Sequence, residues 1–147
     1  MLYIAADHAG HKLKKYLATY ITKTLQQKVE DLGAKTYKED DDFPDYAVAL
    51  AKKVVSNKKN WGILLCGSGQ GMCITANKVP GIRAGLGYSI EAAERGRKED
   101  DMNVLCLASR VLSTEHAAAI VKAFLENNFD GLGRRVRRLK KIAALEK

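Results

Sequence analysis

Residues 61–78 read Trp-Gly-Ile-Leu-Leu-Cys-Gly-Ser-Gly-Gln-Gly-Met-Cys-Ile-Thr-Ala-Asn-Lys, and this stretch decides the fold. The apolar run 63–65 predicts a buried strand, and residues 72–76 predict the start of a helix. Glycines in the turn between them let the backbone bend sharply and bring its N–H groups close to a ligand. Cys66 stands at the mouth of this turn, where a helix N-terminus favours the thiolate form, and Ser68 adds a hydroxyl. The stretch therefore predicts a strand, a turn and a helix that together can hold an anion.

The glycine spacing alone matches no familiar phosphate-binding or nucleophile motif. The Gly-Lys-Ser/Thr that closes a Walker loop is absent. Met72 replaces the third glycine of the dinucleotide fingerprint, and Cys66 replaces the first glycine of a Gly-x-Ser-x-Gly turn. Met72 also stands where a thiol phosphatase loop would need an arginine. Taken alone, the stretch fits equally well a structural turn in which Cys66 is a small core residue.

The rest of the chain repeats the alternation of strand and helix. Apolar runs predict strands at 2–6, 29–32, 63–65, 82–86 and 103–108. Helical spacing predicts helices at 11–27, 43–55, 72–76, 90–99 and 113–125, with a basic helix after Gly133. This order predicts a single α/β domain over residues 1–147, with a doubly wound, five-stranded parallel sheet and helices on both faces, as in flavodoxin-like and Rossmann-like folds.

Chemically useful side chains follow three of the predicted strands. Asp7 and His8 follow the first strand, residues 66–71 follow the third, and Ser109 and Arg110 follow the fifth. In such sheets ligands bind beyond the carboxyl ends of the strands, so these residues should share one edge. The acidic segments 38–42 and 99–101, by contrast, have the composition of solvated loops. The convergence at one edge favours a functional site over a purely structural turn.

Composition limits the other classes of function. The formal net charge is +8, and residues 131–147 hold seven basic residues against one glutamate. Such a tail can bind nucleic acid, a membrane surface or a phosphorylated small molecule. It lacks the interleaved aromatics of many nucleic-acid binders, and no apolar run approaches the roughly 20 residues that span a membrane. The three cysteines form no Cys-x-x-Cys pair, and neither a disulfide framework nor a zinc site is predicted. Reduced thiols without a signal-peptide pattern predict a cytoplasmic protein.

Several short motifs, taken together, resemble those of the type B ribose-5-phosphate isomerases, a group that includes galactose-6-phosphate and allose-6-phosphate isomerases. The matching segments are 7–10, 42–46, 66–71, 76–78, 81–84, 103–105 and 109–111, in order and at matching spacing. The resemblance implies a flavodoxin-like sheet and a homodimer, or a dimer of dimers, with the active site at the subunit interface. It implies metal-free, cofactor-free interconversion of an aldose phosphate and a ketose phosphate through a cis-enediolate.

The resemblance also implies a role for each matching residue. Cys66 is similar to the base that moves a proton between C1 and C2, and Ser68 to its hydroxyl helper. The N–H groups of the turn would cradle the enediolate oxygen, and the C-terminal basic helix would extend to a partner subunit. The implied substrate contacts are Asp7, His8, Tyr46, Gly67, Gly69, Gln70, Gly71, Asn77, Asp100, Arg110, Arg134 and Arg138, the last three as a phosphate clamp.

Two positions depart from that family pattern. Members usually carry histidine and asparagine where this chain has Glu99 and Asp100, and that histidine helps to open the furanose ring. We expect Glu99, as the third catalytic residue, to be a weaker ring-opening group, because an ionised glutamate accepts a proton but does not donate one. In the tail, the family pattern Gly-Arg-His-x-x-Arg becomes residues 133–138, in which Arg135 replaces the histidine. The sequence does not decide which sugar phosphate is preferred or whether the protein forms a dimer or a tetramer. A nucleic-acid-binding module that uses the basic tail is the alternative from another class of function.

Overall fold

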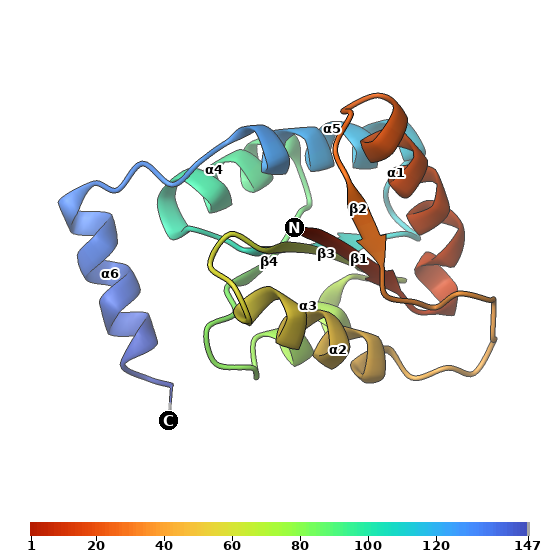
Figure 1. Ribbon diagram of the computed structural model, residues 1–147, viewed down its shortest axis with the longest axis horizontal. Helices are drawn as coiled ribbons and strands as arrows, with labels where there is room; N and C mark the ends of the chain where they lie inside the picture. Colours follow the sequence, from red (N-terminus) through yellow and green to blue (C-terminus); the bar gives the residue numbers. More distant parts are fainter. Residues whose placement is uncertain (147) are drawn as a thin grey trace.

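The computed structural model describes residues 1–146 and contains one five-stranded sheet with the order β2-β1-β3-β5-β4 (Figure 1). The strands are β1 (Leu2–Ala6), β2 (Val29–Asp31), β3 (Trp61–Cys66), β4 (Ala84–Leu86) and β5 (Val104–Ala108). Every pairing between neighbouring strands is parallel. The three central strands are apolar along their length, because helices cover both faces of a parallel sheet. The predicted doubly wound parallel sheet is therefore confirmed.

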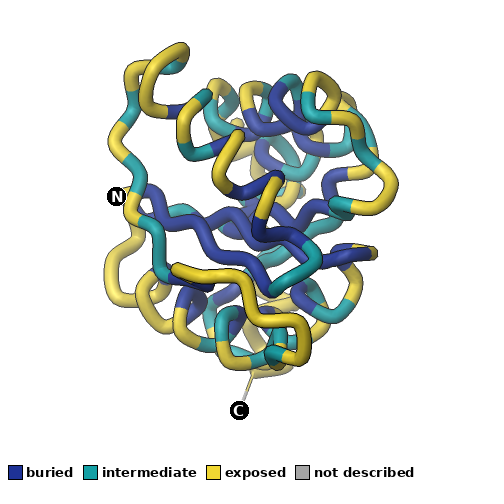
Figure 2. Tube along the Cα trace, turned by 90° about the vertical axis from the view of Figure 1, so that its right-hand side faces the viewer, coloured by how far each residue is buried: buried dark blue, intermediate teal, exposed yellow. Residues whose placement is uncertain are grey.

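The helices are η1 (His8–Gly10), α1 (His11–Lys23), α2 (Phe43–Val55), α3 (Gln70–Ala76), α4 (Ile90–Asp100), α5 (Thr114–Glu126) and α6 (Gly133–Ala143). Five of the helices, α1 to α5, form two layers around the sheet, and α6 lies outside them. α1, α4 and α5 cover one face, and α2 and α3 cover the other (Figure 1). Figure 2 shows the strands as the buried interior and the outer turns of the helices as exposed. Within residues 1–146, we find no helix that combines the length and the apolar character needed to cross a bilayer.

Most predicted boundaries differ from the structure by one or two residues, and two of the differences have a clear local cause. α1 ends at Lys23 rather than at residue 27, because Gln26 takes a left-handed φ of 53° and the Gln27 N–H donates to the carbonyl of Ile21. β4 begins at Ala84 rather than at residue 82, because the chain there still turns through Gly81, whose φ is 88°. Both shifts follow from local turns that hydrophobic spacing does not report.

Candidate active site

The carboxyl ends of β1, β3 and β5 lie side by side, because β3 stands between the other two strands. The Asp7 N–H donates to the carbonyl of Leu65 at 3.3 Å, and the Ser109 N–H donates to the carbonyl of Cys66 at 2.9 Å. The Ser109 hydroxyl lies 2.7 Å from the carbonyl oxygen of Ala9 and 2.9 Å from that of Cys66. One side chain thus joins all three strand ends. The direction of the strand order also reverses between β1 and β3, which is where ligands bind in sheets of this kind.

Cys66 is the last residue of β3, and its side chain turns into the glycine-rich loop. The residue is only 5% exposed, and its Sγ accepts a hydrogen bond from the Gly69 N–H at 3.1 Å. Gly69 has a φ of 75°, which a side chain would strain, and it is the N-cap of α3. The Ser68 side chain is exposed, and its Oγ accepts from the Gln70 N–H at 3.3 Å. A backbone donor on the sulfur stabilises a thiolate, which is the form that can accept a proton.

Arg110 lies directly against the loop. The Arg110 N–H donates to the carbonyl of Gly67 at 3.1 Å, and a Cβ placed on Gly67 would lie 2.5 Å from the Arg110 Nη1. The absence of a side chain at position 67 is what lets the guanidinium approach the backbone. Likewise, a Cβ on Gly71 would lie 2.6 Å from the ring of Phe43, so α3 packs closely on α2. Gly67 thus lets the Arg110 cation lie beside the loop that carries the Cys66 thiol.

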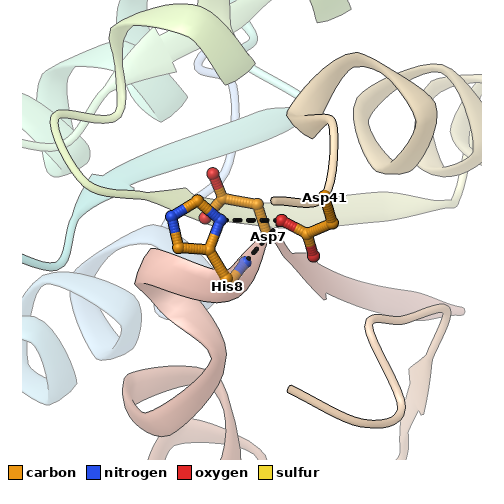
Figure 3. Close-up of side chains that lie close together, drawn as sticks. All are labelled: Asp7, His8 and Asp41. Carbon is orange, nitrogen blue, oxygen red and sulfur yellow. Dashed lines mark hydrogen bonds and ion pairs between the residues drawn. The ribbon is translucent and has the colours of Figure 1, made fainter. Parts of the chain in front are cut away.

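Asp7, His8 and Asp41 form a cluster beside the end of β1 (Figure 3). The Asp7 Oδ1 accepts from the N–H groups of Ala9 and Gly10 at 3.0 and 3.2 Å, which fixes the turn η1. The Asp41 Oδ1 lies 2.8 Å from the His8 Nδ1 and accepts from the His8 backbone N–H at 3.0 Å. The prediction that the segment 38–42 is solvated is therefore wrong for Asp41. Its burial depends on contact with a residue 33 positions away, which local composition does not reveal.

Tyr46, from the first turn of α2, lies next to this cluster. Burial raises the pKa of the Tyr46 hydroxyl above its ordinary value, and the carboxylates of Asp41, Asp45 and Asp7 raise it further. Burial alone would raise the pKa of the Asp41 carboxyl, but hydrogen bonds from His8 and the nearby Tyr46 outweigh burial and lower it. Asp41 is therefore ionised at neutral pH, and Tyr46 keeps its proton and can donate it in a hydrogen bond.

The same cluster has a geometry that could hold a metal ion. One potential ligand atom from each of Asp7, His8 and Asp41 lies within 4.8 Å of the others. However, the Oδ1 atoms of both carboxylates already accept hydrogen bonds from backbone N–H groups. A metal would have to compete with these bonds and with the His8 proton at Nδ1.

Three of the predicted site residues lie at the opposite edge of the sheet. In a β-α-β unit the helix runs back to the amino end of the next strand, so the ends of α3 and α4 are far from the carboxyl edge. Asn77 follows α3 and bonds the N–H and C=O of Ala84 at 2.8 and 2.9 Å, which fixes the start of β4. Glu99 and Asp100 end α4. In one copy of the chain, these three side chains do not join Cys66.

Arg134 and Arg138 are also remote from Cys66 in one copy. Both are exposed on α6, which stands outside the body formed by the sheet and its helices (Figure 1). Arg135 of this helix turns back toward α4, and its Nη2 lies 3.1 Å from the Glu99 Oε1. A groove of about 650 Å³ follows the edge strand β4, between α4 and α6. Its lining includes Asn77, Leu86, Tyr88, Asp100, Met102 and Ile142.

Comparison with known proteins identifies the family. The family model described as Ribose/Galactose Isomerase matches residues 2–142. The chain belongs to the ribose/galactose isomerase family. The probable ribose-5-phosphate isomerase B of Mycoplasma genitalium is 45% identical over 147 residues, which cover 99% of this chain and 95% of that protein. The ribose-5-phosphate isomerase B of Mycobacterium tuberculosis is 35% identical over 146 residues, covering 99% and 90% respectively.

Solved structures show the same fold. The crystal structure of ribose-5-phosphate isomerase B from Mycoplasma genitalium with bound ribulose-5-phosphate has a TM-score of 0.94 and 44% sequence identity to this chain. The alignment covers 99% of this chain and 95% of that one. The ribose 5-phosphate isomerase from Thermotoga maritima has a TM-score of 0.91 and 40% identity, with 97% of each chain covered.

The two departures from the family pattern prove to be linked in space. Glu99 stands at the position of one family histidine, and Arg135 stands at the position of the other. In this chain these two side chains form an ion pair, and each has a second partner, Arg95 for Glu99 and Asp130 for Arg135. In this chain a carboxylate and a guanidinium that pair with each other thus stand at the two positions where the family pattern has histidine.

Proposed function

We propose that this protein is a metal-independent aldose–ketose isomerase, an intramolecular oxidoreductase that interconverts ribose 5-phosphate and ribulose 5-phosphate. Family membership and the names of the most similar relatives support this activity, as does the ribulose-5-phosphate bound in one of them. The observation that carries the proposal in this chain is the Cys66 thiol, held against the Gly69 N–H at the end of β3. That position is the ligand-binding edge of the sheet.

The reaction follows from the groups around this thiol. The Cys66 thiolate removes the C2 proton of the open-chain aldose, and the C–H electron pair forms the C1–C2 double bond of a cis-enediolate. Backbone N–H groups of the loop, from Gly67 to Gly71, stabilise the negative charge on the C1 oxygen. The Cys66 thiol then returns its proton to C1, and the Ser68 hydroxyl assists proton transfer between O1 and O2. Atoms and charge balance, and the thiolate is regenerated.

We further propose that a second copy of the chain completes the phosphate site. Arg110 supplies one cation in place, and α6 of a second copy would bring its Arg134 and Arg138. They are four residues apart and so share one face of the helix. Exposed apolar side chains on and around α6 support an interface, since Ile142 is 48% exposed and Leu145 is 80% exposed. A homodimer, or a dimer of dimers, is the assembly that this arrangement favours.

The test is isomerisation in deuterated water. We would incubate the protein with ribose 5-phosphate, allose 6-phosphate or galactose 6-phosphate, and follow ketose formation and deuterium at the exchanged carbon. We expect ribose 5-phosphate to react fastest, with label entering at the carbon that exchanges its proton. Faster turnover of a hexose phosphate would change the assigned substrate within the family. No ketose and no exchange with any of the three would refute the proposed activity.

The exposed basic helix also allows a test of the nucleic-acid alternative. All basic residues of α6 except Arg135 are exposed, so a nucleic acid could reach them. We expect no shift of random duplex DNA at physiological ionic strength, because a clamp for one phosphate needs only two or three arginines. A salt-dependent shift at micromolar protein would favour the alternative.

A further inference from the structure

Asp41 differs from its neighbours in the acidic segment 38–42. Asp40 and Asp42 are exposed, whereas the side chain of Asp41 is only 4% exposed. Burying a carboxylate is unfavourable unless hydrogen bonds replace its water. The Asp41 Oδ1 meets this need with two bonds, both from His8, while Oδ2 is buried without a hydrogen-bond partner of normal geometry within residues 1–146. The carboxylate is therefore held mainly by His8, and the nearby Tyr46 hydroxyl is its other polar neighbour.

The two bonds fix the His8 ring. The backbone N–H and the Nδ1 of His8 both point to the same Asp41 oxygen, at 3.0 and 2.8 Å. A carboxylate accepts but does not donate, so Nδ1 must carry the proton. Figure 3 shows the other ring nitrogen, Nε2, on the side of the ring away from Asp41. The His8 side chain is 27% exposed, so this nitrogen can reach a ligand at the sheet edge.

The ring is also supported from a second direction. Tyr37 lies edge-on to His8, with ring centroids 6.3 Å apart, and edge-on to His11, with centroids 6.2 Å apart. Both Tyr37 and Asp41 come from the loop between β2 and α2, which thereby lies against the end of β1. The loop restricts the rotation of His8 by contact on one side and by hydrogen bonding on the other.

We propose that Asp41 is a positioning residue for His8, which it holds in the Nδ1–H tautomer so that Nε2 faces the bound sugar phosphate. This inference rests on the proposed function and deepens it, because it assigns a role to a residue of this chain outside the resemblance to the family. The carboxylate does not touch the substrate. With the proton on Nδ1, Nε2 keeps its lone pair and accepts a hydrogen bond from a hydroxyl group of the sugar.

The first experiment observes the tautomer directly in the unmodified protein. Long-range ¹H–¹⁵N correlation spectra of the three histidine rings distinguish Nδ1–H from Nε2–H, and His8→Gln assigns the His8 signals. We expect His8 as the Nδ1–H tautomer, and we expect Asp41→Ala to move it toward the Nε2–H form. An Nε2–H tautomer of His8 in the unmodified protein would overturn the proposal. This result does not depend on whether Asp41→Ala folds.

The second experiment measures substrate binding without turnover. In a Cys66→Ala background, calorimetry with ribose 5-phosphate gives the dissociation constant for three chains: the parent, Asp41→Ala and Asp40→Ala. We expect Asp41→Ala to weaken binding about ten-fold. The matched change Asp40→Ala should alter it less than about two-fold, because Asp40 is exposed.

The outcomes separate this inference from the proposed activity. If Asp41→Ala and Asp40→Ala bound ribose 5-phosphate equally well, the proposed role of Asp41 would be overturned. A residue that only fastens the loop would change the melting temperature of the protein and leave its affinity for the substrate unchanged. Failure of the parent to bind ribose 5-phosphate would instead refute the proposed substrate. In that case the His8 tautomer would still decide whether Asp41 orients the ring.

Discussion

The two ends of the sheet differ in how complete they are in one copy of the chain. At the carboxyl edge, Cys66 and Asp7 are each 5% exposed and are held by backbone hydrogen bonds within the fold. At the other end, the C-terminal arm, which we define as residues 127–146, has no buried residue in its helix α6. The carboxyl edge is therefore preorganised by folding alone, whereas Arg134 and Arg138 of the arm have no ion-pair partner within residues 1–146. Proton transfer and phosphate binding should accordingly respond differently to mutation.

The largest expected effect is at the preorganised edge. Cys66→Ala removes the base, and we expect kcat for ribose 5-phosphate to fall about 10²–10⁴-fold or more, with solvent exchange falling equally. Cys73→Ala is the matched control, because it removes a partly buried thiol that packs against the core beside Ala84. We expect the control to keep kcat within a few-fold. Circular dichroism should show the same fold in both variants, and near-normal turnover in Cys66→Ala would refute the role of Cys66.

The next effect tests the arm. Arg134→Ala and Arg138→Ala should each remove a charge-assisted contact of about 1.5–3 kcal/mol, which is roughly 10–150-fold in KM for ribose 5-phosphate. Free ribose should be affected far less, because it lacks the phosphate. Neither residue contributes buried surface, so the melting temperature of the chain should stay constant.

Lys140→Ala provides the control for charge. It lies on the same helix and removes the same charge, but six residues from Arg134 it points to a different side. We expect its KM to match that of the unmodified protein. If all three variants raised KM equally, the arm would act through its overall charge and not through a clamp.

Much of the carboxyl edge was predictable from the sequence, and the reason is geometric. Residues that follow β1, β3 and β5 must meet when the strands are parallel, so the proximity of Asp7, Cys66 and Arg110 follows from the hydrophobic pattern. The burial of Asp41 was not predictable, because it depends on a hydrogen bond to His8 across 33 residues. Local composition carries no record of such a contact.

At the amino edge of the sheet, the resemblance to the family does not explain how three predicted site residues reach the site. Asn77, Glu99 and Asp100 were grouped with the site, yet each follows or ends a helix that runs antiparallel to the strands. The same topological rule that unites the carboxyl edge thus places them at the amino edge of one copy. A role for them at the site would require a second copy, and sequence spacing within one chain does not indicate how two copies meet.

A smaller effect tests the contact between Arg110 and the loop. A Cβ at position 67 would lie 2.5 Å from the Arg110 Nη1, and the end of this long side chain can shift to relieve the clash. We expect Gly67→Ala to fold normally and to raise KM about five-fold, equivalent to roughly 1 kcal/mol. In an Arg110→Ala background the same change should have no further effect on KM. Additive effects would show that Gly67 acts independently of Arg110.

The smallest effect concerns the ion pair that replaces two family histidines. Glu99 is already neutralised by Arg95 at 3.0 Å and Arg135 at 3.1 Å, so Glu99→Gln should lower kcat modestly, by less than about three-fold. Glu99→His restores a group that can both donate and accept a proton near neutral pH, but it also removes the carboxylate that pairs with the Arg135 cation. We therefore expect the single variant to hold or slightly raise kcat, and Glu99→His with Arg135→His to raise it further. The measurement is kcat from about pH 5 to 9 for the unmodified protein and these three variants, with Arg135→His added so that the two histidine changes form a double-mutant cycle. A loss in Glu99→Gln as deep as that in Cys66→Ala would make Glu99 essential and would contradict this account. No change in any variant would show that the end of α4 lies outside the assembled site, and the arm would then contribute to phosphate binding alone.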